Sequence, residues 1–385
     1  MKVVLSTPGK FHTFDLAREL HSNGILHAIF TGYPRFKLKT EQIPQQLIHS
    51  FPWVHAPYMR ISNNGLMPEW IIKQWEYLDK VSLDYFVGHN MPACDIFVGL
   101  SGSALKSGRK AKTLGAKYVC DRGSSHIRTQ DQLLAEEYAL WGEHYLGIDP
   151  RVIAREEAEY AEADCITVPS TFNVNSFIDQ GVPEHKIKRI SYGVNLNKFH
   201  PTTTPSQETF DVLFVGGMQL RKGVQYLLQA YKALHHPQKT LTLAGSISQS
   251  FINLMRTKGH WDESITVLGH VDQAKLKDVM SRSHVMVLPS IEEGLAMVQA
   301  QAMACGCPVI GTQHTGAEDL FSNGKEGFIV PIRNPYAITE KLQLLADSPD
   351  LQKAMREASL KKVQAIGGWA EYGRQAVVTY QGLLS

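Results

Sequence analysis

The sequence lacks the features that would place it in a membrane, outside the cell or on a nucleic acid. Its apolar runs are far shorter than the roughly 20 residues of a membrane-spanning helix. The N-terminal stretch Met1–His12 has three apolar residues in a row, which is typical of a strand and not of a secretion signal. The 39 lysines and arginines nearly balance the 37 aspartates and glutamates, so a nucleic-acid partner is not expected.

Cysteine is scarce and shows no pairing pattern. The residues are scattered, no CxxC motif for zinc occurs, and two of them stand too close together for an easy disulfide. They are Cys94, Cys120, Cys165, Cys305 and Cys307. We expect reduced thiols and a cytoplasmic protein, and a peripheral contact with the inner face of a membrane stays open.

Common motifs for nucleotides and metals are missing as well. The chain has neither the GxxxxGK[ST] loop of Walker A proteins nor the GxGxxG loop of dinucleotide oxidoreductases. No DxD-like pair of carboxylates is placed to hold a metal ion, because Asp149 and Asp164 stand alone. We therefore expect chemistry that needs no metal.

Short apolar runs alternate with longer amphipathic ones, a pattern that favours parallel sheets covered by helices on both faces. The first group of expected strands is Lys2–Ser6, Leu26–Thr31, Asp95–Leu100, Lys117–Cys120 and Cys165–Val168. The second group is Asp211–Val215, Thr240–Ala244, Ile265–Leu268, Val285–Leu288 and Val309–Gly311. A polar, proline-flanked linker at 201–208 separates them. The pattern predicts an α/β protein with domains 1–200 and 201–368, and a last helix, 369–385, that joins the first domain.

Ligands of open α/β sheets bind outside the carboxyl ends of the strands, so the loops there are the candidate site. The loop 215–223 carries Gly216 and Gly217, then Arg221 and Lys222 just before a helix. Cations beside a helix N-terminus suit a phosphate or diphosphate. The alternative is an ordinary solvated Arg-Lys pair.

Two further loops carry groups that suit a polyhydroxylated ligand. Glu293 and Gly294 open a predicted helix that runs to about Cys305, and Gln301 lies two turns on, near the same face. Glu293 can accept hydrogen bonds from sugar hydroxyls, or can merely cap the helix. In the third loop, Glu318 can orient Lys222, hold the Gly316 turn, or cap a helix.

The stretch 289–312 resembles the signature of the retaining glycosyltransferase family 4, which typically reads P-S-x-x-E-G-F-G-L-x-x-x-E-A-M-A-x-G-x-P-V-I-x-T. The residues in register are Pro289, Ser290, Glu293, Gly294, Ala302, Met303, Ala304, Gly306, Pro308, Val309, Ile310 and Thr312. The stretches 161–170, 187–201 and 214–228 are similar to the family too. The resemblance implies a GT-B fold: two Rossmann-like parallel-sheet domains that face each other across a cleft.

The resemblance also implies roles for single residues. Lys222, with Arg221 beside it, would bind the donor diphosphate, and the backbone of Gly294 would face sugar and phosphate. Glu293 would contact the transferring sugar. Gln301 stands where the family has a Glu that holds the ribose, so the charge is lost there although hydrogen bonding is retained. Gly217 stands where the family often has an Arg, and Arg221 is the candidate replacement for that cation.

In the N-terminal domain the resemblance places Gly9 in a loop near the donor phosphate. It implies a His near the reacting centre, and His126 is the candidate, with Asp121 competing for that register. A lone His is more often structural. His12 and Arg122 are candidates for contact with the acceptor.

The implied function is the metal-independent transfer of a hexose-type sugar from a UDP- or GDP-type nucleotide sugar to a glycan, a lipid-linked acceptor or a small molecule, with retention and without a cofactor. In the family the leaving phosphate is thought to take the acceptor's proton. A nucleotide-sugar epimerase and a silent donor-binding or scaffold protein are the alternatives. The segments 35–39 and 70–75 can touch a membrane or a lipid-linked acceptor, although helix core and solvated surface are favoured.

Overall fold

The computed structural model describes residues 1–61 and 67–385, and it contains two wholly parallel sheets, one in each half of the chain. The seven-stranded sheet has the order β3-β2-β1-β4-β5-β6-β7 and the six-stranded sheet the order β10-β9-β8-β11-β12-β13. The first comprises β1 (Val3–Thr7), β2 (Leu26–Thr31), β3 (Ile48–Ser50), β4 (Ile96–Leu100), β5 (Lys117–Asp121), β6 (Cys165–Val168) and β7 (Ile187–Arg189). The second comprises β8 (Phe210–Val215), β9 (Lys239–Ala244), β10 (Thr266–Gly269), β11 (Val285–Leu288), β12 (Val309–Thr312) and β13 (Gly327–Val330). Two Rossmann-like domains of this kind confirm the predicted α/β fold class.

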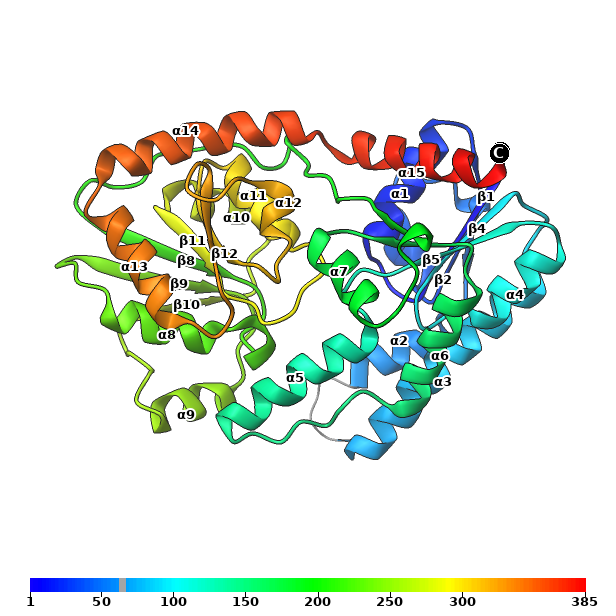
Figure 1. The fold of residues 1–385 in the computed structure, drawn as a ribbon, viewed down its shortest axis with the longest axis horizontal. Helices are drawn as coiled ribbons and strands as arrows, with labels where there is room; N and C mark the ends of the chain where they lie inside the picture. The colour runs from blue at the N-terminus through cyan, green and yellow to red at the C-terminus, as the bar shows by residue number, and fades with distance from the viewer. Residues whose placement is uncertain (62–66) are drawn as a thin grey trace.

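Helices cover both sheets, and the two domains lie side by side (Figure 1). Helices of the first half are α1 (His12–Ser22), α2 (Pro52–Ile61), α3 (Glu69–Asn90), α4 (Leu105–Thr113), α5 (Ile127–Trp141), α6 (Pro150–Glu162) and α7 (Thr171–Asp179). Those of the second are α8 (Val224–Ala233), α9 (Gln249–Thr257), α10 (Gln273–Arg282), α11 (Met297–Ala304), α12 (Ala317–Leu320), α13 (Pro335–Ala346) and α14 (Pro349–Ile366). The strands β3, β7 and β13, each at the edge of a sheet, were not predicted.

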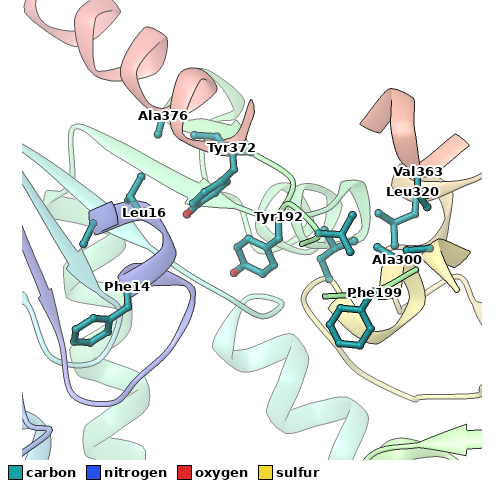
Figure 2. Packing of buried hydrophobic residues seen from close by; sticks show 14 of the residues in the cluster. Phe14, Leu16, Tyr192, Phe199, Ala300, Leu320, Val363, Tyr372 and Ala376 are labelled. Carbon is teal, nitrogen blue, oxygen red and sulfur yellow. The ribbon is translucent and has the colours of Figure 1, made fainter. Parts of the chain in front are cut away.

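The last helix, α15 (Trp369–Leu384), returns to the N-terminal domain and packs against α1. Figure 1 shows α14 and α15 following one another along one side of both domains. The approach to α1 is close, since a Cβ added at Gly373 would lie 2.4 Å from the Cβ of Glu19. In Figure 2 the apolar cluster extends from α1 and α15 past Tyr192 to Phe199 on the C-terminal side.

Helix α5 belongs to the first half of the chain but is anchored in the second domain. The carboxylate of Glu137 is fully buried and accepts hydrogen bonds from Gln225 at 2.7 Å, Tyr226 at 2.8 Å and Arg333 at 2.8 Å. The ring of Trp141 packs in the C-terminal core and donates to the Tyr226 hydroxyl at 3.3 Å. Because a buried charge must keep its partners, this contact holds the two domains together.

No helix in the described ranges is long and apolar enough to cross a membrane. The five cysteines, all described, are buried and free of disulfides, as the scattered spacing predicted.

Replacing Glu137 with alanine should lower the free energy of unfolding by about 3 kcal/mol, because Arg333 and two polar side chains lose their buried partner. Its neighbour Glu136 is a matched control: it also pairs with Arg333, at 3.0 Å, but its side chain is 44% exposed. The Glu136→Ala change should cost less than about 1 kcal/mol. Urea denaturation of both variants measures the difference, and equal effects would show that the burial of Glu137 adds nothing.

Candidate active site

The loop after β8 and the loop after β11 are in close contact at the carboxyl ends of the strands of the C-terminal sheet. Gly223, at the end of the single turn η5 (Leu220–Lys222), has a φ of +68°. A Cβ added there would lie 1.8 Å from the carbonyl oxygen of Pro289, so no larger residue fits. The backbone N–H of Ile291 also donates to the carbonyl of Arg221 at 2.8 Å. The loop that carries Arg221 and Lys222 and the loop 289–296, called the signature loop below, therefore form one unit.

Within this unit Lys222 forms an ion pair with Glu293, so the two predicted donor residues do meet. The hydroxyl of Ser290 donates to the same carboxylate oxygen at 3.2 Å. Helix α11 begins at Met297, later than predicted, and its N-cap, Ala296, makes no side-chain hydrogen bond. Glu293 is therefore not the helix cap that the alternative interpretation required.

The N-terminal domain holds the signature loop from the other side. Ser170 donates to the carbonyl of Gly294 at 2.8 Å, and Asn173 donates to the carbonyl of Glu293 at 3.2 Å. Both come from the start of α7. A Cβ added at Gly294 would lie only 1.9 Å from the carbonyl oxygen of Gly123, in the loop after β5. The glycine thus allows the two domains to approach backbone to backbone at the donor-facing position.

Arg221 lies beside Lys222, but its charge is paired with the carboxylate of Glu292. Its guanidinium pairs with the buried carboxylate of Glu292 at 2.9 Å and donates to the Glu292 carbonyl at 3.1 Å. The expectation that Arg221 replaces the cation missing at Gly217 is therefore not supported by its geometry. Glu292 was not singled out from the sequence, because it stands at a variable position of the signature.

A cavity of about 570 Å³ opens between the domains; Lys222, Glu293 and Gly294 are not among the residues that line it. Gln301 and Met297 of α11 line part of the cavity. Tyr192, after β7, and Trp369, the first residue of α15, line it as well. Another part of the lining comes from the β1–α1 loop, from α1 and from the segment near residue 41, and it includes Lys10, Phe11, His12, Asp15, Arg18 and Glu41. Gln301 and His12, assigned to donor and acceptor from the sequence, thus face the same space.

His126 does not face this cavity, which corrects its prediction as the catalytic histidine. Its ring lies 5.0 Å from those of Tyr160 and Phe177, centroid to centroid, and it caps α5 by accepting from the N–H of Arg128 at 3.3 Å. Burial lowers the pKa of His126 to about 4, so the ring is neutral at pH 7. The residue is a structural helix cap.

Arg122 is likewise not free to meet an anionic acceptor. It pairs with the buried carboxylate of Glu156 at 2.8 Å and donates to Gln130 at 2.8 Å. Gly9 accepts a hydrogen bond from Thr7 at 3.1 Å and immediately precedes Lys10, a residue of the cavity wall. Its contact with a phosphate stays a prediction.

In the third loop Asp319 is the carboxylate that contacts the N-terminal domain, whereas Glu318 is exposed. Asp319 accepts from the N–H and the hydroxyl of Thr171 at 2.8 Å each and pairs with Arg189. This loop therefore joins the two domains at the start of α7 and does not orient Lys222.

The two segments proposed for membrane contact present aromatic side chains to solvent. Trp70 and Phe36 are each 68% exposed, contrary to the favoured assignment of Trp70 to a helix core. Trp75 is partly buried and donates to the carbonyl of Val54 at 3.3 Å. A membrane contact stays a prediction.

The chain is similar in sequence and in fold to known proteins. Residues 197–362 match the family described as glycosyl transferases group 1. The chain is 24% identical to spore coat protein SA of Bacillus subtilis over 269 residues, which covers 61% of the chain and 71% of that protein. It is 25% identical to D-inositol 3-phosphate glycosyltransferase 1 of Catenulispora acidiphila over 295 residues, 70% of each.

Solved structures share the whole architecture. Sucrose-phosphate synthase from Thermosynechococcus elongatus has a TM-score of 0.75 and 21% identity, with 100% of this chain and 99% of that one covered. HepE of Anabaena, in complex with UDP and glucose, has a TM-score of 0.72 and 15% identity over 99% and 100% of the two chains. Residues 197–362 thus match the group 1 glycosyl transferases, and the whole chain has the GT-B fold of two Rossmann-like domains.

Proposed function

We propose that the protein transfers a hexose-type sugar from a nucleotide diphosphate sugar of the UDP or GDP type to a hydroxyl acceptor, with retention of configuration and without a metal ion. The observation that carries the proposal is the unit formed by Lys222, Glu293 and Gly294 just before α11, whose first residue, Met297, lines the interdomain cavity. HepE, which shares the fold, has been solved with UDP-glucose, UDP and glucose.

In this proposal the diphosphate lies against Lys222 and the N-terminus of α11. When the bond from the anomeric carbon to phosphate breaks, negative charge develops on the leaving oxygen and positive charge on the sugar. The ammonium of Lys222 and the N–H groups of the helix end stabilise the anion, and the carboxylate of Glu293 faces the sugar. These groups supply the charge compensation that a metal ion supplies elsewhere.

Donor binding must also loosen the ion pair between Lys222 and Glu293. In the structure the two charges pair with each other. A bound diphosphate offers Lys222 a stronger partner and leaves the Glu293 carboxylate to accept hydrogen bonds from the sugar hydroxyls. The ion pair therefore holds the two side chains beside each other, and donor binding divides them between phosphate and sugar.

A thermal-shift screen of nucleotide sugars, followed by product analysis with glycan and lipid-linked acceptors, tests the function. A true donor should raise Tm because it binds only the folded protein. An epimer formed without an acceptor would establish the epimerase instead. Binding without hydrolysis or transfer would establish a silent donor-binding protein.

The Lys222→Ala variant should lose about 100-fold or more in kcat, because one phosphate-facing charge is removed, while Tm changes little. Lys341 gives a matched control: its side chain is also 26% exposed and pairs with a carboxylate, that of Glu340, at 2.7 Å. Lys341→Ala should leave the rate unchanged. A near-normal rate for Lys222→Ala would remove this residue from the site.

The Gln301→Glu variant restores the carboxylate that the family has at this position, and Gln301 faces the open cavity. We expect the donor Kd to stay the same or to fall, since ribose hydroxyls can donate to a carboxylate. Calorimetric titration with UDP and GDP sugars measures the change. A large loss of affinity would mean that the pocket is built for the amide.

The Gly294→Ala variant should reduce transfer on the order of 100-fold, because the new Cβ would collide with the Gly123 carbonyl and displace the reacting groups. Gly382, in α15, is the control: a Cβ there meets nothing within 4 Å, so Gly382→Ala should keep full activity. Steady-state kinetics together with small-angle scattering measure activity and domain opening. An unchanged rate in Gly294→Ala would show that the close approach is dispensable.

A further inference from the structure

Part of the cavity lining holds side chains that the proposed donor site does not use. Gln301, which the proposal assigns to the donor, comes from α11 in the C-terminal domain. The N-terminal domain contributes Phe11 and Asp15 at the start of α1, and Gln42 in the segment before the single turn η2 (Gln45–Leu47). These three side chains therefore line the space that the domain opposite the donor leaves for the second substrate.

Phe11 brings an aromatic ring to this space. The ring lies against Gly9, since a Cβ added at Gly9 would lie 2.7 Å from its Cε2 atom and 2.9 Å from Cζ. Phe11 is nevertheless 50% exposed, although phenylalanine is usually a buried residue. The face of an aromatic ring carries partial negative charge and attracts the polarised C–H groups of a sugar. Phe11 therefore offers a surface on which a pyranose ring can pack.

Asp15 follows Phe11 by four residues, so it lies about one helical turn away on the same face of α1. Its Oδ1 atom accepts a hydrogen bond from Arg18, whereas no donor in residues 1–61 and 67–385 forms a hydrogen bond to Oδ2. Burial raises the pKa of Asp15 above its ordinary value, because the nearby cations do not fully compensate the lost hydration. Oδ2 is thus an acceptor that a ligand hydroxyl can satisfy.

Gln42 has a strained backbone, with a φ of +57°. A residue with a side chain seldom adopts this conformation, and holding it costs free energy. In the described ranges the other such residue is Arg333, whose guanidinium is held by two ion pairs. The amide of Gln42 forms no hydrogen bond with any described residue, and Gln42 is exposed at the cavity. The strain therefore presents the amide to the cavity and serves no side-chain contact within the described chain.

The charges of the lining favour a ligand without charge. Glu41 is 4% exposed and pairs with Lys10 and, at 2.8 Å, with Arg18. Arg18 also pairs with Asp15. Among the lysines and arginines of the lining, Lys198 is the one that forms no ion pair with a described residue, and it is exposed. An anionic ligand would thus meet one unpaired cation, whereas a neutral sugar would meet a ring, a carboxylate oxygen and an amide.

We propose that Phe11, Asp15 and Gln42 form the acceptor subsite and that the acceptor is an uncharged saccharide. The sugar ring packs on Phe11, and its hydroxyls donate to Oδ2 of Asp15 and form hydrogen bonds with the amide of Gln42. This rests on the proposed function, which places the donor on the C-terminal domain. The three residues select and position the acceptor and take no part in breaking or forming the glycosidic bond.

A panel of acceptors tests the class of ligand. Transfer is measured from the donor found by thermal shift to methyl glucoside, methyl galactoside, methyl mannoside and maltose. Glucose 6-phosphate, glycerol and octanol are the comparison acceptors. We expect at least one neutral saccharide to exceed each of these three by about tenfold or more in kcat/KM, because the subsite is built to bind sugar hydroxyls. A preference for glucose 6-phosphate, glycerol or octanol would overturn the assignment.

Three variants separate acceptor binding from donor binding. Phe11→Ala removes the ring, Asp15→Asn removes the carboxylate, and Gln42→Gly removes the amide. Each should raise the KM for the saccharide acceptor by about tenfold, because a contact with the sugar is lost. The donor Kd, titrated without acceptor, should not change. Glycine accommodates a positive φ, so Gln42→Gly should keep or raise Tm, and its higher KM could not come from unfolding.

Matched controls show whether the effect belongs to the subsite. Phe11→Tyr keeps a ring at this position and should leave the acceptor KM near the wild-type value. Tyr85 in α3 is 54% exposed, and Glu19 lies one turn beyond Asp15 in α1. Neither of them lines the cavity. Tyr85→Ala and Glu19→Gln should therefore leave the acceptor KM unchanged.

Each result decides between the two proposals. A raised acceptor KM in all three variants, with an unchanged donor Kd and normal controls, supports the subsite. A Phe11→Ala protein that loses donor affinity and keeps its acceptor KM would assign the ring to the donor and refute the subsite. Normal KM values in Asp15→Asn and Gln42→Gly would refute the hydroxyl contacts. A protein that binds the donor but transfers to no neutral saccharide refutes this inference alone, whereas one that binds no nucleotide sugar refutes the proposed function.

Discussion

The arrangement of the whole cleft depends on one buried carboxylate, that of Glu292. It accepts from the N–H and the hydroxyl of Ser125, at 3.1 and 2.8 Å, and from Gln130 at 3.0 Å, all in the N-terminal domain. From its own domain it pairs with Arg221. Burial raises the pKa of Glu292, but the charge of Arg221 and the hydrogen bonds from Ser125 outweigh it and bring the pKa below its ordinary value. Its stabilising effect is thus present above the pKa of the unfolded chain and lost as pH falls through the lower folded value.

Because Glu292 directly precedes Glu293, the interaction that joins the domains also positions the donor site. The side chain of Glu292 reaches into the N-terminal domain, and the next side chain pairs with Lys222 in the C-terminal one. The backbone that follows is held by Ser170 and Asn173. Separation of the domains would therefore release the signature loop from its hydrogen bonds to the N-terminal domain, which makes closure and assembly of the donor site a single event.

The sequence predicted those parts of the molecule that depend on local pattern. Ten of the strands were expected, since each is a short, largely apolar run, and the loops that carry Lys222 and Glu293 were both expected at the carboxyl ends of parallel strands. Their ion pair was not predicted. Side-chain direction was not predictable in the same way. Asp121 ends β5 and His126 follows it by five residues, but the side chain of His126 turns into the core and that of Asp121 toward His12, over 100 residues away in the chain. Nothing in the linear pattern distinguishes these two directions.

The departures from the family signature are best understood together. Where the family often has an arginine the chain has Gly217, and where it has a glutamate the chain has Gln301, so one positive and one negative charge are both missing. Arg221 does not compensate, because Glu292 engages it. The two losses cancel in net charge, and Lys222 is left opposite Glu293 as the ion pair of the site. A diphosphate entering here meets fewer charges of either sign, so backbone N–H groups and the neutral amide of Gln301 must carry more of the recognition.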